Sequence, residues 1–192
     1  MLFRSTALAA RGVDTVTFNF VYTEQGRRVP DKNDKLESCW RAVIATVCGG
    51  NPPQAGEGRG GEDRKLVIGG KSMGGRIASQ VASQPATAGG DNIAGLVFLG
   101  YPLHPPGRPD KLRSEHLARI RAPMLFVQGS RDAFGTPDEL RAVLTGVKAA
   151  ADLCVVDGGD HSFKVPKRGA IPQDQVYETV LDEIVRWMRT LD

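Results

Sequence analysis

The sequence has few cysteines and few aromatic residues. Its 192 residues include three cysteines, two tryptophans and three tyrosines. Cys39, Cys48 and Cys154 are too few and too widely spaced for a disulfide framework, and no C-x-x-C pair or Cys/His cluster indicates a metal site. The sequence therefore predicts a cytoplasmic protein, from a reducing compartment, that uses neither a metal nor another cofactor.

Long apolar runs and blocks of basic residues are also missing. No apolar stretch reaches the 18 residues typical of a membrane span, and the first residues lack the basic start and long apolar core of a signal peptide. The net charge of +3 comes from basic residues scattered along the chain without interleaved aromatic residues, which argues against a nucleic-acid partner. We expect one domain, residues 1–192, without a membrane or nucleic-acid partner; the sequence predicts no oligomeric state.

Strand and helix patterns alternate along the chain, which predicts a mostly parallel sheet covered by helices on both faces, the three-layer α/β/α architecture. The first residues are typical of a helix end that Gly12 stops, and residues 49–63 form a Gly/Pro-rich surface connection. Expected strands lie at residues 14–20, 65–69, 93–99, 123–128 and 153–156, and expected helices at residues 34–47, 112–120, 137–149 and 173–188, besides one that follows Ser72.

The most informative stretch is Gly70-Lys71-Ser72-Met73-Gly74, which interrupts an apolar run and precedes a helical pattern. A serine hydroxyl can attack only when a sharp strand-to-helix turn holds it clear of the backbone, and glycines two residues to either side leave room for that turn. We therefore interpret Ser72 as a nucleophile. Gly70-Lys71-Ser72 also ends like a phosphate-binding P-loop, but the position of that motif's first glycine holds Lys65, inside the expected strand.

Candidate partners of Ser72 follow the later strands, where the carboxyl ends of a parallel sheet collect catalytic groups. Asp132 follows the strand at 123–128, and His161 follows the strand at 153–156. The order serine, aspartate, histidine is the order of a hydrolase triad on such a sheet. Asp157 and Asp160 compete with Asp132 as the acid, although Asp160 is adjacent to His161 and poorly placed to orient its ring.

These motifs resemble the α/β-hydrolase superfamily, and further stretches resemble a small dienelactone-hydrolase-like branch that includes uncharacterised bacterial proteins and a eukaryotic chromatin-complex subunit. The similarity spans essentially the whole chain. It rests on Gly70-Lys71-Ser72-Met73-Gly74-Gly75-Arg76, Gly129-Ser130-Arg131-Asp132, Gly159-Asp160-His161-Ser162, Phe18-Asn19-Phe20-Val21-Tyr22 with Gly26-Arg27-Arg28, and Gly100-Tyr101-Pro102-Leu103-His104-Pro105-Pro106-Gly107. Dienelactone hydrolases proper use a cysteine nucleophile, whereas this chain offers Ser72.

The resemblance implies hydrolysis of a small ester, thioester or amide through an acyl-enzyme. Ser72 is then the nucleophile, His161 the base, and Asp132 the residue that holds the imidazole. The Met73 amide is one donor to the oxyanion. Four residues near strand ends, Tyr22, Arg28, Tyr101 and His104, are expected to bind the substrate, with Arg28 a candidate clamp for a carboxylate, unless they only brace loops.

The chain departs from the family at one place, because it has no Gly-rich loop to supply a second oxyanion donor. In the family, that loop and its strand precede the helix whose end residues 2–11 resemble. We therefore expect an N-terminally truncated α/β-hydrolase fold, either because the given start lies downstream of the natural one or because the chain is a fragment. In that fold the strands at 14–20 and 65–69 either pair directly or leave a hydrophobic slot. Two functions stay open: a serine hydrolase, and a non-catalytic interaction or scaffold domain.

Overall fold

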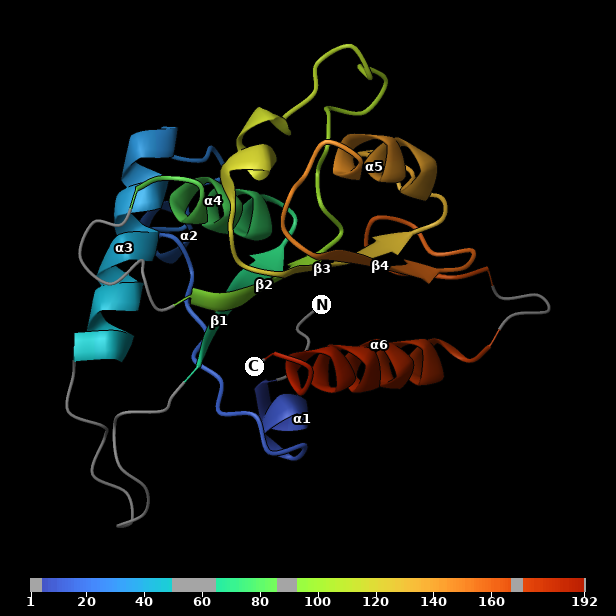
Figure 1. The fold of residues 1–192 in the computed structure, drawn as a ribbon, viewed down its shortest axis with the longest axis horizontal. Coiled ribbons are helices and arrows are strands. Elements are labelled where there is room, and N and C mark those ends of the chain that lie inside the picture. The colour runs from blue at the N-terminus through green and yellow to red at the C-terminus, as the bar shows by residue number, and fades with distance from the viewer. Residues whose placement is uncertain (1–4, 50–64, 86–92, 167–170, 192) are drawn as a thin grey trace.

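The computed structural model describes residues 5–49, 65–85, 93–166 and 171–191, so the expected connection at 49–63 lies outside the described residues except for Gly49. Four parallel strands form one sheet in the order β1-β2-β3-β4 (Figure 1). Their bounds are Leu66–Lys71 for β1, Ile93–Leu99 for β2, Met124–Gly129 for β3 and Ala151–Val156 for β4. Each parallel crossover passes over a face of the sheet, which places helices there.

Helices cover both faces of this sheet (Figure 1). One face carries α3 (Asn33–Gly49), α4 (Met73–Ala82) and α5 (Pro137–Leu144), and the other carries α1 (Ser5–Ala9) and α6 (Gln173–Met188). Successive side chains of β2 and β3 point to opposite faces. Phe98 and Phe126 pack beneath α4, whereas Val97 and Leu125 pack with Trp187 of α6. The expected three-layer architecture is therefore confirmed.

The strand register brings the four carboxyl ends to one edge. Lys71 lies opposite Leu99, and Leu99 lies opposite Val127. Gly129 ends β3 opposite Val156, the last residue of β4. The segments that follow all four strands therefore leave the sheet side by side, which is the arrangement that a shared site needs.

The segment at residues 14–20 is not a strand, so that expectation is wrong, as is its direct pairing with β1. Phe18 packs edge-on against Trp40 of α3, with 4.7 Å between ring centroids, and Phe20 is buried in the same cluster. These aromatic contacts hold the segment against the helical layer. β1 pairs with β2, and among the described residues no strand pairs with its other edge.

Three further differences concern short elements. The expected helix at 112–120 is a 3₁₀ helix, Glu115–Arg119, and the sequence did not predict α2 (Val21–Glu24). The expected helix at 137–149 ends at Leu144, because the chain turns at Gly146, whose amide bonds to the Val143 carbonyl. At its start, Thr136 and Glu139 form a reciprocal capping box. No helix in the described ranges is both long and apolar enough to cross a bilayer.

Candidate active site

Ser72 lies on the sharp turn between β1 and α4. Its φ of 51° and ψ of −122° are unusual for a residue with a side chain, and the backbone around it is crowded. A Cβ on Gly75 would lie 2.5 Å from the Gly70 carbonyl oxygen, whereas a Cβ on Gly74 would meet nothing within 4 Å. The turn is therefore the expected elbow, but Gly75, and not Gly74, is the glycine on α4 that its packing requires.

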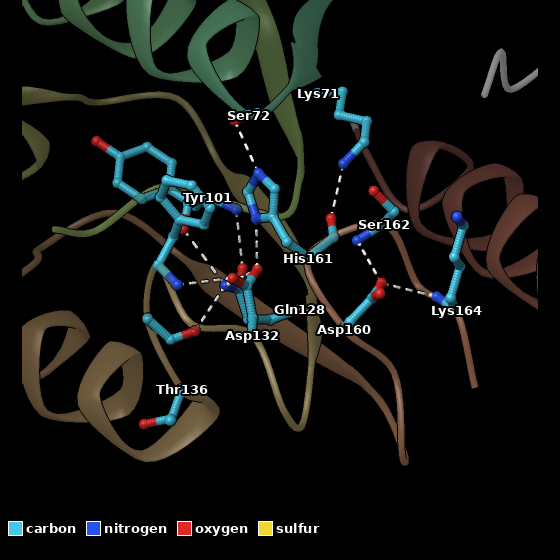
Figure 2. Close-up of polar contacts among 12 residues, drawn as sticks. Lys71, Ser72, Tyr101, Gln128, Asp132, Thr136, Asp160, His161, Ser162 and Lys164 are labelled. Carbon is cyan, nitrogen blue, oxygen red and sulfur yellow. Dashed lines mark hydrogen bonds and ion pairs between the residues drawn. The ribbon is translucent and has the colours of Figure 1, made fainter. Parts of the chain in front are cut away.

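His161 connects Ser72 with Asp132 through two hydrogen bonds (Figure 2). The Asp132 carboxylate accepts from Nδ1–H at 2.8 Å, which leaves Nε2 to accept from the Ser72 hydroxyl at 2.8 Å. Asp132 is buried, with 1 % of its surface exposed. The three residues therefore form a serine–histidine–aspartate chain with the nucleophile at one end and a buried carboxylate at the other.

The competing aspartates make other contacts. Asp157 Oδ1 accepts a long bond of 3.4 Å from the Ser130 hydroxyl. Asp160 Oδ1 accepts from the backbone amides of Ser162 and Lys164, at 2.7 and 3.0 Å. Asp132 is thus the one of the three candidate acids that contacts the imidazole in this structure, and Asp160 shapes the loop that carries it.

Gln128, which the sequence analysis missed, fixes the Asp132 carboxylate. Its Nε2 donates to Asp132 Oδ2 at 2.9 Å and to the Gly135 carbonyl at 2.8 Å, and its Oε1 accepts from the Tyr101 amide at 2.8 Å. The Phe134 amide donates to the other carboxylate oxygen at 2.8 Å. The signal was present in the sequence, because a glutamine in a fully buried strand needs internal partners.

Two other residues enclose the imidazole. The Phe134 ring lies 4.3 Å from the His161 ring, centroid to centroid. Gly100 has a φ of 65°, and a Cβ there would lie 3.3 Å from His161 Nδ1 and 3.0 Å from its carbonyl oxygen. A side chain at position 100 would therefore press on the histidine as well as strain the backbone.

Tyr101 and His104, two of the four residues expected to bind the substrate, have buried side chains, which favours the alternative that they brace loops. Tyr101 is 1 % exposed, and its hydroxyl donates to the Arg113 carbonyl at 3.0 Å. Burial raises the pKa of Tyr101 to about 12. His104 is also buried; its Nδ1 lies 2.8 Å from the Pro105 carbonyl oxygen and its Nε2 3.4 Å from Glu139. Both residues brace the segment that follows β2.

The remaining expected substrate residues lie in and after α2. The Tyr22 ring stacks on Phe20 at 6.3 Å and packs against the core. Arg28 is exposed in the bend that follows. No contact found within the described ranges connects Tyr22 or Arg28 with Ser72, Asp132 or His161, so their role in binding stays a prediction.

A second serine–histidine pair joins α4 to the 3₁₀ helix at Glu115–Arg119. Ser79 Oγ is 2.7 Å from His116 Nε2, but Ser79 is 0 % exposed. Burial, with help from Arg119 and Arg76, lowers the pKa of His116 to about 4, so its ring is neutral near pH 7. This pair is a buried polar contact that no substrate can reach. Within the described ranges, no group of three or more His, Cys, Asp or Glu side chains is arranged to hold a metal ion.

Comparisons with known proteins agree with this geometry. A family model described as an alpha/beta hydrolase domain matches residues 1–189. An alpha-beta serine hydrolase homologue from Coxiella burnetii is 19% identical with a TM-score of 0.68, over 96% of this chain and 73% of its own. A dienelactone hydrolase from Anabaena variabilis is 18% identical with a TM-score of 0.67, over 98% of this chain and 77% of its own. A protein of unknown function from Agrobacterium tumefaciens is 17% identical with a TM-score of 0.69, over 97% of this chain and 76% of its own.

Proposed function

The chain belongs to the alpha/beta hydrolase family, and from this premise we propose that it is a serine hydrolase of small esters, thioesters or amides. The observation that carries the proposal is the hydrogen-bonded chain from Ser72 through His161 to Asp132. The likeness in fold to a dienelactone hydrolase agrees with the branch that the sequence motifs resemble.

The proposed reaction is acyl transfer to water. Ser72 Oγ attacks the substrate carbonyl while its proton passes to His161 Nε2, and Asp132 stabilises the imidazolium that forms. Collapse of the tetrahedral intermediate breaks the bond to the leaving group, which takes the proton from His161. Water then attacks the acyl-Ser72 ester with His161 again as the base, and the carboxylic acid and free Ser72 result.

The proposed oxyanion donor is the amide of Met73. Met73 is the first residue of α4, and the first amides of a helix have no partner within the helix and carry a partial positive charge. This amide directly follows the nucleophile, where the oxyanion forms. For substrate binding, the corresponding proposal is that the substrate bears a carboxylate and that Arg28 binds it.

The unpaired edge of β1 favours the second candidate function, a non-catalytic interaction or scaffold domain. In this fold the second oxyanion donor comes from the loop after an earlier strand, and no strand within the described ranges pairs with that edge. Loss of one oxyanion donor costs roughly 10²–10³ in kcat. A hydrolase without that donor is therefore slow but still turns over substrate, whereas a scaffold domain shows no turnover.

The acyl-enzyme can be tested by measuring how its acyl group divides between two competing nucleophiles, water and methanol. We expect a butyrate oxygen ester and a butyrate thioester, each hydrolysed in the presence of methanol, to give the same ratio of methyl butyrate to butyrate, because both products arise from one acyl-Ser72 intermediate. Gas chromatography of the products measures that ratio. Ratios that depend on the leaving group contradict the intermediate, and no turnover above the buffer rate favours the scaffold function.

Gln128 gives a prediction about the orientation of Asp132. Gln128→Leu removes a donor to the carboxylate and leaves the buried Tyr101 amide without its acceptor. Since a hydrogen bond to a charged group contributes about 1.5–3 kcal/mol, we expect kcat/KM to fall about 10- to 100-fold and the unfolding temperature to drop. Ester kinetics and thermal unfolding measure these effects. Wild-type kinetics in Gln128→Leu would show that Asp132 needs no such support.

A further inference from the structure

Lys71 contacts the segment that carries His161, although the proposed reaction does not use it. It is the last residue of β1, directly before Ser72, and its ammonium donates to the His161 carbonyl oxygen at 2.6 Å (Figure 2). The same Nζ lies 5.6 Å from the centroid of the Phe163 ring. Lys71 therefore joins the strand of the nucleophile to the loop of the base.

The loop that Lys71 contacts has an unusual conformation. Phe163 is buried and has a φ of 60°, which residues with a side chain seldom adopt. Asp160 closes the loop on itself through its bonds to the Ser162 and Lys164 amides. These bonds fix the shape of the loop but not its position relative to Ser72. The Lys71 bond connects the loop directly to the residue next to Ser72.

The Lys71 ammonium is half-buried and lies near other charged groups. Burial lowers the pKa of this ammonium, while the nearby carboxylates of Asp132 and Asp160 raise it. Other charged or titratable groups near the loop include Lys164 and Tyr177, which interact with Asp160, and Arg131, whose Nε donates to the Gly158 carbonyl at 2.9 Å. A charged donor makes a stronger hydrogen bond to the His161 carbonyl than a neutral donor does.

We propose that Lys71 is a positioning residue for the reaction: its charged hydrogen bond to the His161 carbonyl holds His161 at bonding distance from Ser72. This role rests on the proposed hydrolase function. Because a charged donor makes a stronger hydrogen bond than a neutral one, variants that remove the donor, keep a neutral donor or keep a charged donor grade the strength of this contact.

The test compares three variants and a matched control. Lys71→Met removes bond and charge, Lys71→Gln keeps a donor without the charge, and Lys71→Arg keeps both. Lys65→Met is the control, because Lys65 is an exposed lysine whose ammonium also donates to a backbone carbonyl, that of Leu191 at 2.7 Å. The readout is the rate of covalent labelling of Ser72 by a fluorophosphonate at pH 8.

We expect Lys71→Met to label about 10-fold more slowly than wild type, the effect of losing one hydrogen bond from a charged donor. Lys71→Gln should lose less, and Lys71→Arg and Lys65→Met should label at close to the wild-type rate. A wild-type rate in Lys71→Met, or an equal loss in Lys71→Met and Lys71→Arg, overturns the proposal. If Lys71→Met does not fold, the comparison of Lys71→Gln with Lys71→Arg decides in the same way.

A measurement that needs no catalysis separates this proposal from the proposed function. The chain has three histidines, so the Hε1 resonance of His161 can be assigned by NMR with His161→Gln. We expect its chemical shift at pH 8 to differ from wild type in Lys71→Met and to return toward the wild-type value in Lys71→Arg, whether or not the protein turns over an ester. A wild-type resonance in Lys71→Met would refute the positioning role of Lys71 even in an active hydrolase.

Discussion

Ser72→Ala is expected to lower kcat/KM for an activated ester by about 10⁴-fold or more. The variant removes the atom that bonds to the substrate and keeps the glycines that shape the turn. Alanine at this position retains a φ of 51°, which strains its backbone as it strains that of Ser72, so the fold should be preserved. Steady-state kinetics and a thermal unfolding curve on the same preparation measure both properties.

Ser79→Ala is the matched control for this variant, because Ser79 also bonds to a histidine, His116, but is buried. We expect Ser79→Ala to lose some stability, about 1–3 kcal/mol for a disturbed buried bond, and to keep most of its turnover. If Ser79→Ala loses turnover as completely as Ser72→Ala in a folded protein, or if Ser72→Ala stays active, the assignment of the nucleophile is wrong.

Asp132→Asn is expected to lower kcat about 10⁴-fold with little change in KM, although the side chain keeps its shape. The Phe134 amide requires an acceptor at one side-chain atom, which turns the new amide group toward Gln128 and His161. That group donates to His161 Nδ1, so the ring carries its proton on Nε2 and can no longer accept the proton of Ser72. The kcat of the variant should then partly recover at high pH, where hydroxide can take the Ser72 proton in place of His161.

Asp157→Asn is the control for Asp132→Asn, because Asp157 follows β4 in the sequence but contacts Ser130. We expect its kcat within about 3-fold of wild type, as for an exposed residue outside the hydrogen-bonded chain. A loss in Asp157→Asn as large as the loss in Asp132→Asn would identify Asp157 as the acid instead.

The sequence predicted the parts of the fold that depend on buried apolar runs. Strands such as Ile93–Leu99 are covered on both faces, and they read as continuous apolar segments with turn residues at their ends. The segment at 14–20 has a similar local pattern, but a strand also requires a partner for its backbone. Phe18 packs against Phe20 and Trp40 instead, and no local pattern specifies that contact.

The sequence could predict those residues of the candidate site that follow the ends of parallel strands. Ser72, Asp132 and His161 each follow a parallel strand, so topology alone brings them to one edge. The direction of a side chain after a strand end is set by tertiary packing, which is why Tyr101 was expected to bind substrate although its ring lies in the core. The Lys71 bond joins residues 90 positions apart, so sequence reasoning could not find it. A buried Gln128 indicates that internal partners exist, but the sequence does not specify which groups they are.

The most direct test of the hydrolase proposal is mass spectrometry of the folded protein after treatment with a fluorophosphonate, which bonds to an activated serine. We predict one adduct per chain, located by peptide fragmentation on Ser72, absent in Ser72→Ala and formed much more slowly in His161→Gln. A well-folded protein that forms no adduct, or forms it on another serine, would contradict the account.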